Sequence, residues 1–205
     1  MHPYIFNTFE KILSGKEISG PVLEIGAVPR ENTLLNLPVL LNITEKVGIN
    51  LEGPFTYKDL TFHQCNANNM DIFPDDYFGV VLCNAMLEHD RYFWKTVKEI
   101  KRVIIPGGIV VIGTPGFSAS KFHQAISRLD RFLWYRKLKS SKTFGFLLAS
   151  TRTLEVHGEA YGDFYRFSAA TYRHVFFPDF ERVEIIEVMN PPRIIGIGYK
   201  PEYSH

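Results

Sequence analysis

The chain has 205 residues, of which 45% are hydrophobic and 22% are charged, and its formal net charge is +1. These values are ordinary for a globular protein and fit one domain with a large buried core. A near-neutral charge lacks the basic excess of nucleic-acid-binding domains, so no nucleic-acid partner is expected. The two cysteines, Cys65 and Cys83, are too few for a disulfide framework or a zinc site. We expect both to be reduced core residues.

The N-terminal sequence does not have the pattern of a signal peptide, because no positively charged region precedes an apolar core. No uncharged apolar run is long enough to span a bilayer. We therefore expect a cytoplasmic protein.

Helical and strand patterns alternate along the first half of the chain. Apolar residues at helical spacing predict a helix within residues 1–19 that stops at Gly15. The stretch from 27 to about 45 predicts at most a weak helix, which Pro38 would end. Short apolar runs predict buried strands at 22–26, 46–50, within 60–67, within 77–84, and at 109–113.

The second half adds two expected helices and a hairpin. Asp90 is expected to cap a helix that Pro106-Gly107-Gly108 breaks, and Ser168 to cap another through Val175. Residues 180–189 and 192–200 predict the last two strands. Their connection is too short for a helical crossover, so they should form an antiparallel hairpin at the sheet edge.

This order of elements predicts the α/β class. We expect a Rossmann-like three-layer α/β/α sandwich with a seven-stranded, mostly parallel sheet and an antiparallel C-terminal hairpin. Residues 1–205 should form a single domain, with an N-terminal helix in 1–19 and an insertion at 116–167.

Four short motifs occur in order on the predicted strands and turns. They are VLEIG at 22–26, KVGIN at 46–50, YFGVVLCNAMLEH at 77–89 and RVIIPGGIVVIGTP at 102–115. Together they resemble the class I S-adenosylmethionine-dependent methyltransferases, and most closely the type 11 group, over roughly residues 20–115. The resemblance implies methyl transfer to a small-molecule acceptor, with S-adenosylmethionine as the cofactor.

The resemblance also implies a cofactor site at the carboxyl ends of the strands, where ligands bind in open parallel sheets. Glu24 would meet the cofactor's ammonium, Asn50 would bond the ribose, and Asn66 would lie beside the adenine. The full set of implied cofactor-binding residues is Glu24, Gly26, Ala27, Asn50, Glu52, Asn66, Ala67, Asn84, Ala85, Met86 and His89.

The chain departs from the family pattern at several of these positions. Ala27-Val28-Pro29 replaces further glycines, Asn50 and Asn66 stand where acids are usual, and Gly79 replaces an acid that often opens the fourth strand. An amide can still bond ribose or adenine, but more weakly than a carboxylate, by about a factor of two. We expect weakened cofactor affinity or a reshaped pocket. A relative that has lost catalysis remains the alternative.

A polar cluster at 157–168 lies after the fifth strand, where the family places acceptor-binding elements. His157 and Tyr161 are the candidate catalytic bases. Asp163, Tyr165 and Arg166 are candidate acceptor-binding residues. For His157 alone, a loop held by Asp163–Arg166 hydrogen bonds is the favoured interpretation.

Three further observations concern membrane contact, metal binding and a nicotinamide oxidoreductase as an alternative function. Residues 121–142 are basic and amphipathic, which fits peripheral membrane contact, although a lid or packing helix is the simpler interpretation. No side chains have the clustered spacing of metal ligands, so no metal is expected. A nicotinamide oxidoreductase is disfavoured because Val28 and Pro29 interrupt the glycine loop that it would need.

Overall fold

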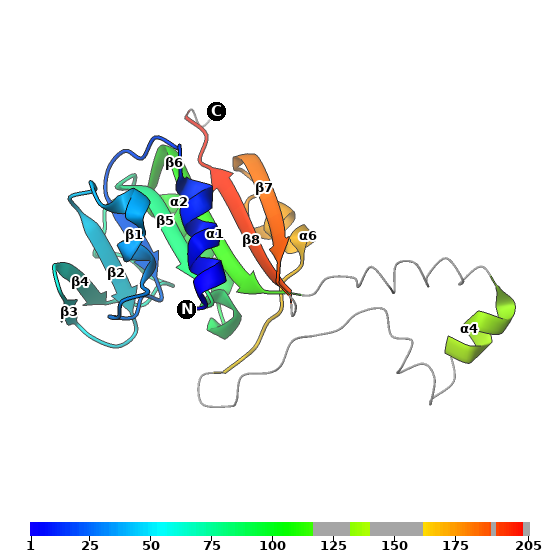
Figure 1. Ribbon diagram of the computed structural model, residues 1–205. Helices are drawn as coiled ribbons and strands as arrows, with labels where there is room; N and C mark the ends of the chain where they lie inside the picture. Colours follow the sequence, from blue (N-terminus) through cyan, green and yellow to red (C-terminus); the bar gives the residue numbers. More distant parts are fainter. Residues whose placement is uncertain (117–131, 140–161, 190–191, 203–205) are drawn as a thin grey trace.

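The structure is a computed structural model that describes residues 1–116, 132–139, 162–189 and 192–202 (Figure 1). One mixed sheet crosses the molecule in the strand order β3-β4-β2-β1-β5-β6-β8-β7. The strands are β1 (Val22–Ile25), β2 (Lys46–Asn50), β3 (Phe55–Tyr57), β4 (Leu60–Gln64), β5 (Phe78–Asn84), β6 (Ile104–Pro115), β7 (Glu181–Val188) and β8 (Arg193–Tyr199).

Helical segments lie on both faces of this sheet, whereas α4 (Leu133–Lys139) lies away from it (Figure 1). The other α-helices are α1 (Pro3–Leu13), α2 (Phe93–Val103) and α6 (Ala169–Thr171). Short 3₁₀ turns form η1 (Leu34–Asn36), η2 (Pro38–Leu40) and η3 (Leu87–His89), and η6 (Tyr172–Phe176) is a π-helical turn. The predicted α/β class and three-layer arrangement are confirmed.

The sheet is parallel from β4 through β2, β1 and β5 to β6. Strand β8 runs antiparallel to both β6 and β7, which confirms the C-terminal hairpin. The predicted count of seven strands is wrong, because β3 adds an eighth, antiparallel to β4. Two of the three residues of β3 are exposed, so this edge strand has no buried apolar run to predict it.

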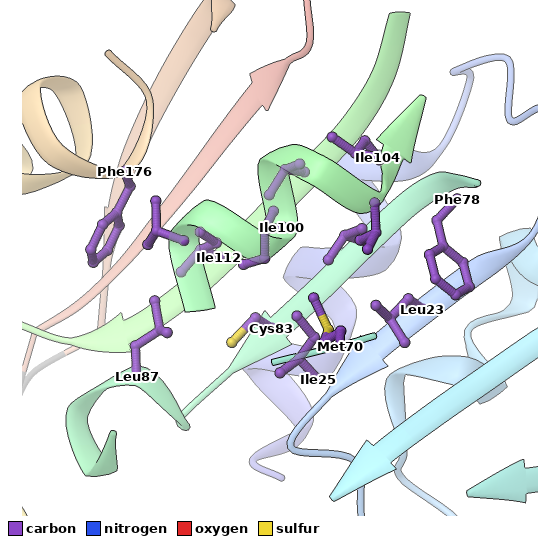
Figure 2. Close-up of a cluster of buried hydrophobic side chains, with 14 of the residues drawn as sticks. Leu23, Ile25, Met70, Phe78, Cys83, Leu87, Ile100, Ile104, Ile112 and Phe176 are labelled. Atoms are coloured by element: carbon purple, nitrogen blue, oxygen red, sulfur yellow. The ribbon is translucent and has the colours of Figure 1, made fainter. Parts of the chain in front are cut away.

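Side chains alternate in direction along each strand, so the buried residues form two clusters, one on each face of the sheet. Leu23 and Ile25 point to the face covered by α2 and η6, where they join the cluster shown in Figure 2. Val22, with Val80 and Leu82 of β5, points to the face covered by α1, η1 and η2. Both faces of β1 and β5 are buried, which explains why their sequences are continuous apolar runs.

Helix boundaries follow the sequence predictions with three corrections. Helix α1 forms as predicted, and Ser168 caps α6 through a reciprocal pair with Thr171. The stretch from 27 to 45 contains two 3₁₀ turns instead of a helix, and Pro38 begins the second of them. Helix α2 starts at Phe93, three residues after Asp90, whose carboxylate nevertheless accepts from the amide of Tyr92 at 2.8 Å.

The third difference from the predictions is that Pro106-Gly107-Gly108 does not end α2. The helix already ends at Val103, and these three residues lie inside β6. Among the described residues, no helix has the length and apolar character needed to cross a membrane.

Candidate functional site

A hollow of about 330 Å³ lies beyond the carboxyl ends of β1, β2, β4 and β5. This is the switch point of the sheet, since the chain passes from β1 to β2 on one side and later returns to β5 on the other. The volume is at the lower end of the range for small-molecule pockets, roughly 300–1,000 Å³. Seven of the eleven predicted cofactor residues line it: Gly26, Asn50, Asn66, Ala67, Ala85, Met86 and His89.

Gly26 forms the floor between β1 and the loop after β5. Its φ is +73°, and its amide donates to the carbonyl of Ile49 at 2.9 Å. A Cβ at this position would lie 2.8 Å from Cγ of Met86, so no larger residue fits without displacing that side chain. Val28 and Pro29 are absent from the lining of the hollow, so the altered glycine loop does not fill it.

A second cavity of about 180 Å³ shares Gly26 and Ala85 with the first. The start of α1 closes it on one side, through Met1, His2 and Ile5. Its polar and charged lining residues include Glu24, Arg30, Asn84 and Arg193. The predicted residues Glu24 and Asn84 therefore face this cavity and not the larger hollow. Ala27 and Glu52 line neither: Ala27 is buried in the core beneath α1, and Glu52 is exposed.

Glu24 is buried at the centre of β1, with an exposed fraction of 5%. Its Oε2 accepts a hydrogen bond from the Thr33 hydroxyl and a second from the amide of Leu35 at 3.3 Å. Burial raises the pKa of this carboxyl, although these hydrogen bonds oppose the rise. Contact between Glu24 and the cofactor stays a prediction, because the carboxylate also anchors the loop that leads into η1.

Asn50 links the end of β2 to the loop after β1. Its Nδ2 donates to the carbonyl of Ala27 at 2.8 Å, and its Oδ1 accepts from the amide of Glu52 at 3.3 Å. Side-chain amide oxygens have two lone pairs, so Oδ1 keeps acceptor capacity toward the hollow. The asparagine thus has a local structural role in addition to the predicted contact with ribose.

Three polar side chains join the loop after β4 to the start of α2. Asn68 Nδ2 donates to Asp90 Oδ2 at 2.7 Å and to Thr96 Oγ1 at 2.9 Å, and Thr96 Oγ1 donates to the same carboxylate oxygen at 2.7 Å. We call Asn68, Asp90 and Thr96 the loop latch. It joins two segments of the lining of the hollow, because Asn68 follows Asn66 and Ala67 in the loop after β4 and Asp90 precedes α2.

The loop after β5 carries the remaining predicted residues. Ala85 has a φ of +54° and donates its amide to Gly113, which directs the chain across the strand ends. Asn84 Oδ1 is buried and has no hydrogen-bond partner among the described residues. His89 lines the hollow and its Nδ1 bonds the carbonyl of Gly162.

The acceptor-binding candidates lie on the segment that follows residue 161. Arg166 forms a two-pronged pair with the Asp163 carboxylate, as the sequence suggests. Tyr165 donates its hydroxyl to the carbonyl of Arg91 at 3.0 Å and packs against Phe93 and Phe167. The catalytic candidates His157 and Tyr161 lie outside the described residues, as does most of the basic stretch 121–142.

Several residues that line the two cavities at this edge of the sheet were not predicted from the sequence. Cys65, Asn68, Asp90 and Tyr92 line the main hollow, and Arg193 lines the smaller one. The sequence pattern assigns Asp90 only a capping role. Its position next to the predicted site residue His89 could have indicated that it lies at the site. Arg193 lies at the site because the terminal hairpin places the start of β8 beside the end of β6. Its distance from the other site residues along the sequence does not indicate this.

Comparison with known proteins agrees with this architecture. Residues 41–112 match a family model described as a methyltransferase domain, of type 11. No curated protein sequence matches the chain.

Solved structures with the same fold include several methyltransferases. The chain is similar to Burkholderia thailandensis 1,6-didemethyltoxoflavin-N1-methyltransferase with bound S-adenosylhomocysteine, at 13% identity and a TM-score of 0.59, covering 96% of this chain and 78% of that one. It is also similar to the N-methyltransferase NodS from Bradyrhizobium japonicum with S-adenosylhomocysteine, at 10% identity and a TM-score of 0.60, covering 98% and 87%. A Haloferax volcanii methyltransferase, solved with the Trm112 methyltransferase activator, matches at 13% identity and a TM-score of 0.57, covering 98% and 91%.

The strand order, the hollow at the switch point and the family match define a class I methyltransferase fold. The resemblance to this class, including its type 11 character, is confirmed. Methyl transfer is the general activity that these findings support.

Proposed function

We propose that this protein transfers a methyl group from S-adenosylmethionine to a small-molecule acceptor. The observation that carries the proposal is the hollow of about 330 Å³ floored by Gly26, at the strand ends where this sheet type binds ligands. The residues present fit an adenosyl group there: a glycine floor that a Cβ would obstruct, an apolar wall from Ile49 and Met86, and amides at Asn50 and Asn66.

Asn50 would bond the ribose hydroxyls, and Asn66 with Ala67 would lie beside the adenine. The amino-acid half would enter the smaller cavity, which shares the lining residues Gly26 and Ala85 with the hollow. There Arg30 offers a guanidinium to its carboxylate, and the Glu24 carboxylate offers an acceptor to its ammonium. The loop latch would keep the adenine-side wall in place before the ligand arrives.

When bound, S-adenosylmethionine supplies a methyl carbon that an acceptor lone pair attacks, while the carbon–sulfur electron pair stays on sulfur and the acceptor loses a proton. The chain mainly has to align the two molecules and exclude water. Asp163, Tyr165 and Arg166 are the proposed acceptor-side residues, and His157 and Tyr161 remain the proposed proton acceptors.

Isothermal titration calorimetry with S-adenosylmethionine and S-adenosylhomocysteine tests the proposal. We expect one site per chain for each ligand, with competition between them. No heat with either ligand at millimolar concentration would overturn it.

A cofactor-binding relative without catalysis is the second candidate. It is favoured by the structural engagement of Glu24 with Thr33 and of Asn50 with Ala27. Binding of both ligands, with no methylated product from any acceptor in a broad panel, would support this alternative over the first.

A further inference from the structure

Arg193 is a half-buried arginine that has no acidic partner in the described part of the chain. Its Nη1 is buried and has no hydrogen-bond partner there. None of the ion pairs between described residues includes it. A buried guanidinium donor without an acceptor is costly, so its presence needs an explanation.

Two other arginines among the described residues are half-buried, and both have carboxylate partners. Arg102 donates to Glu99 at 2.7 Å, and Arg166 forms the two-pronged pair with Asp163. Such pairing is what normally offsets the cost of burying a charge. The contrast indicates that the acidic partner of Arg193 comes from a ligand.

Arg193 lines the smaller cavity together with Glu24 and Asn84. Each of these three residues lies two positions along its strand from a member of the buried cluster beneath α1. Side chains two positions apart in a strand point to the same face of the sheet, so all three point toward α1. They come from β1, β5 and β8, which makes the cavity a meeting point of three separate strand ends.

The charges in this cavity suit a ligand that carries both an ammonium and a carboxylate. Glu24 supplies an acid, and Arg30 and Arg193 supply two guanidinium groups. Arg30 is exposed, so water competes for its donors and screens its charge. Nη1 of Arg193 is shielded from water, where a hydrogen bond to a carboxylate is stronger.

We propose that Arg193 binds the carboxylate of the cofactor's amino-acid half. The planar fork of a guanidinium can donate to both oxygens of one carboxylate, so the ligand would complete the ion pair that the described chain lacks. The protein would then select the intact cofactor over forms without the carboxylate. This inference rests on the proposed methyl transfer, and it adds a cofactor residue from outside the motifs that the sequence indicates.

Three ligands separate the carboxylate from the rest of the cofactor. S-adenosylmethionine and its decarboxylated form differ by the carboxylate alone, whereas methylthioadenosine keeps the adenosine and the sulfur but lacks the amino-acid half. Their affinities are measured by calorimetry on the full chain and on Arg193→Gln. The control Arg173→Gln removes an exposed arginine of η6, and thus the same charge.

We expect the wild type and Arg173→Gln to bind S-adenosylmethionine about tenfold or more tightly than the decarboxylated form, because one charged hydrogen bond is lost with the carboxylate. Arg193→Gln should lose this preference, through a fall of about tenfold or more in its affinity for S-adenosylmethionine. Its affinity for the decarboxylated form and for methylthioadenosine should not fall.

Equal affinity of the wild type for S-adenosylmethionine and the decarboxylated form would overturn the proposal, even if Arg193→Gln failed to fold. A preference that survives in Arg193→Gln but disappears in Arg30→Gln would also overturn it, by assigning the carboxylate to Arg30. Weaker binding of all three ligands by Arg193→Gln would show a structural arginine and overturn it too.

Methylthioadenosine separates these outcomes from a failure of the proposed function. If the wild type binds methylthioadenosine but shows no preference for the carboxylate, only the role of Arg193 is wrong. If the wild type binds none of the three ligands, the proposed function itself is contradicted.

Discussion

At the scale of single residues, Gly26 is the position on which the cofactor site depends most. It combines a positive φ with the close approach of the Met86 side chain, whereas Gly15 has a similar φ of +75° and no atom within 4 Å of where a Cβ would lie. Any L-residue at either position costs about 1–2 kcal/mol for the left-handed conformation. Only at Gly26 would a methyl group also displace a wall of the hollow.

The substitution Gly26→Ala should therefore lower both stability and affinity for S-adenosylhomocysteine, the latter by about tenfold or more. Gly15→Ala should lower stability by about 1–2 kcal/mol and leave affinity unchanged. Urea unfolding and calorimetry on both variants measure the two effects. Equal nucleoside affinity in Gly26→Ala and the wild type would contradict the assigned floor.

The buried carboxyl of Glu24 makes a prediction about pH. Burial raises its pKa above the ordinary value of 4.5, so the native state holds this proton to higher pH than the unfolded chain does. The free energy of unfolding contributed by this group must then fall as pH rises from 4.5 through the raised pKa. Glu24→Gln removes this titration.

We expect the Tm of Glu24→Gln, measured relative to the wild type, to increase between about pH 4 and pH 7. The exposed control Glu187→Gln should show no such trend. Parallel Tm profiles for Glu24→Gln and the wild type would show that Glu24 is not a group with a raised pKa.

At the scale of elements, the loop latch connects two segments that both line the site. The carboxylate of Asp90 accepts from Asn68, Thr96 and the amide of Tyr92, so one side chain bonds both the segment before α2 and the loop after β4. Its loss should cost about 1–3 kcal/mol, because the donors that it accepts from would lose their partner.

Asp90→Ala and Asn68→Ala should each weaken S-adenosylhomocysteine binding, and their effects on stability should not add. A double-mutant cycle should give a coupling energy of about 0.5–3 kcal/mol. Asp71→Ala, at an exposed position in the same loop, is the matched control. Additive effects of the two latch substitutions would rule out the proposed connection.

Gly79 shows why one departure from the family pattern is necessary in this chain. A Cβ there would lie 1.4 Å from the carbonyl oxygen of Ser19, because the segment before β1 crosses directly over the start of β5. Gly79→Ala should destabilise the fold by about 3 kcal/mol or more. Gly107→Ala, where the nearest atom is 3.7 Å away, should cost only the strain of its positive φ of +75°, about 1–2 kcal/mol. Comparable Tm values for the two variants would contradict this packing.

At the scale of the whole molecule, the elements with strong apolar patterns are the predictable ones. Strands β1 and β5 are buried on both faces and have continuous apolar sequences, and the terminal hairpin follows from a connection too short for a helix. Strand β3 is not predicted from the sequence, because it lies at the edge of the sheet and its mostly exposed residues form no apolar run. The turns η1 and η2 replace the expected helix because Pro38 has no amide hydrogen with which to continue one, yet the two turns still bury Leu34, Leu35 and Leu40 in the core on that face.

The site is predictable where motif and strand end coincide, as at Gly26, Asn50 and Asn66. It is not predictable where topology brings distant segments together. Arg193 reaches the site from the start of β8, and Met1 and His2 reach it from the start of α1.

The most direct test of the central claim is a crystal structure of the protein grown with saturating S-adenosylhomocysteine. We expect density for one nucleoside in the hollow at Gly26, with its ribose beside Asn50 and its adenine beside Asn66 and Ala67. A hollow without a nucleoside, or a nucleoside bound elsewhere on the molecule, would contradict it.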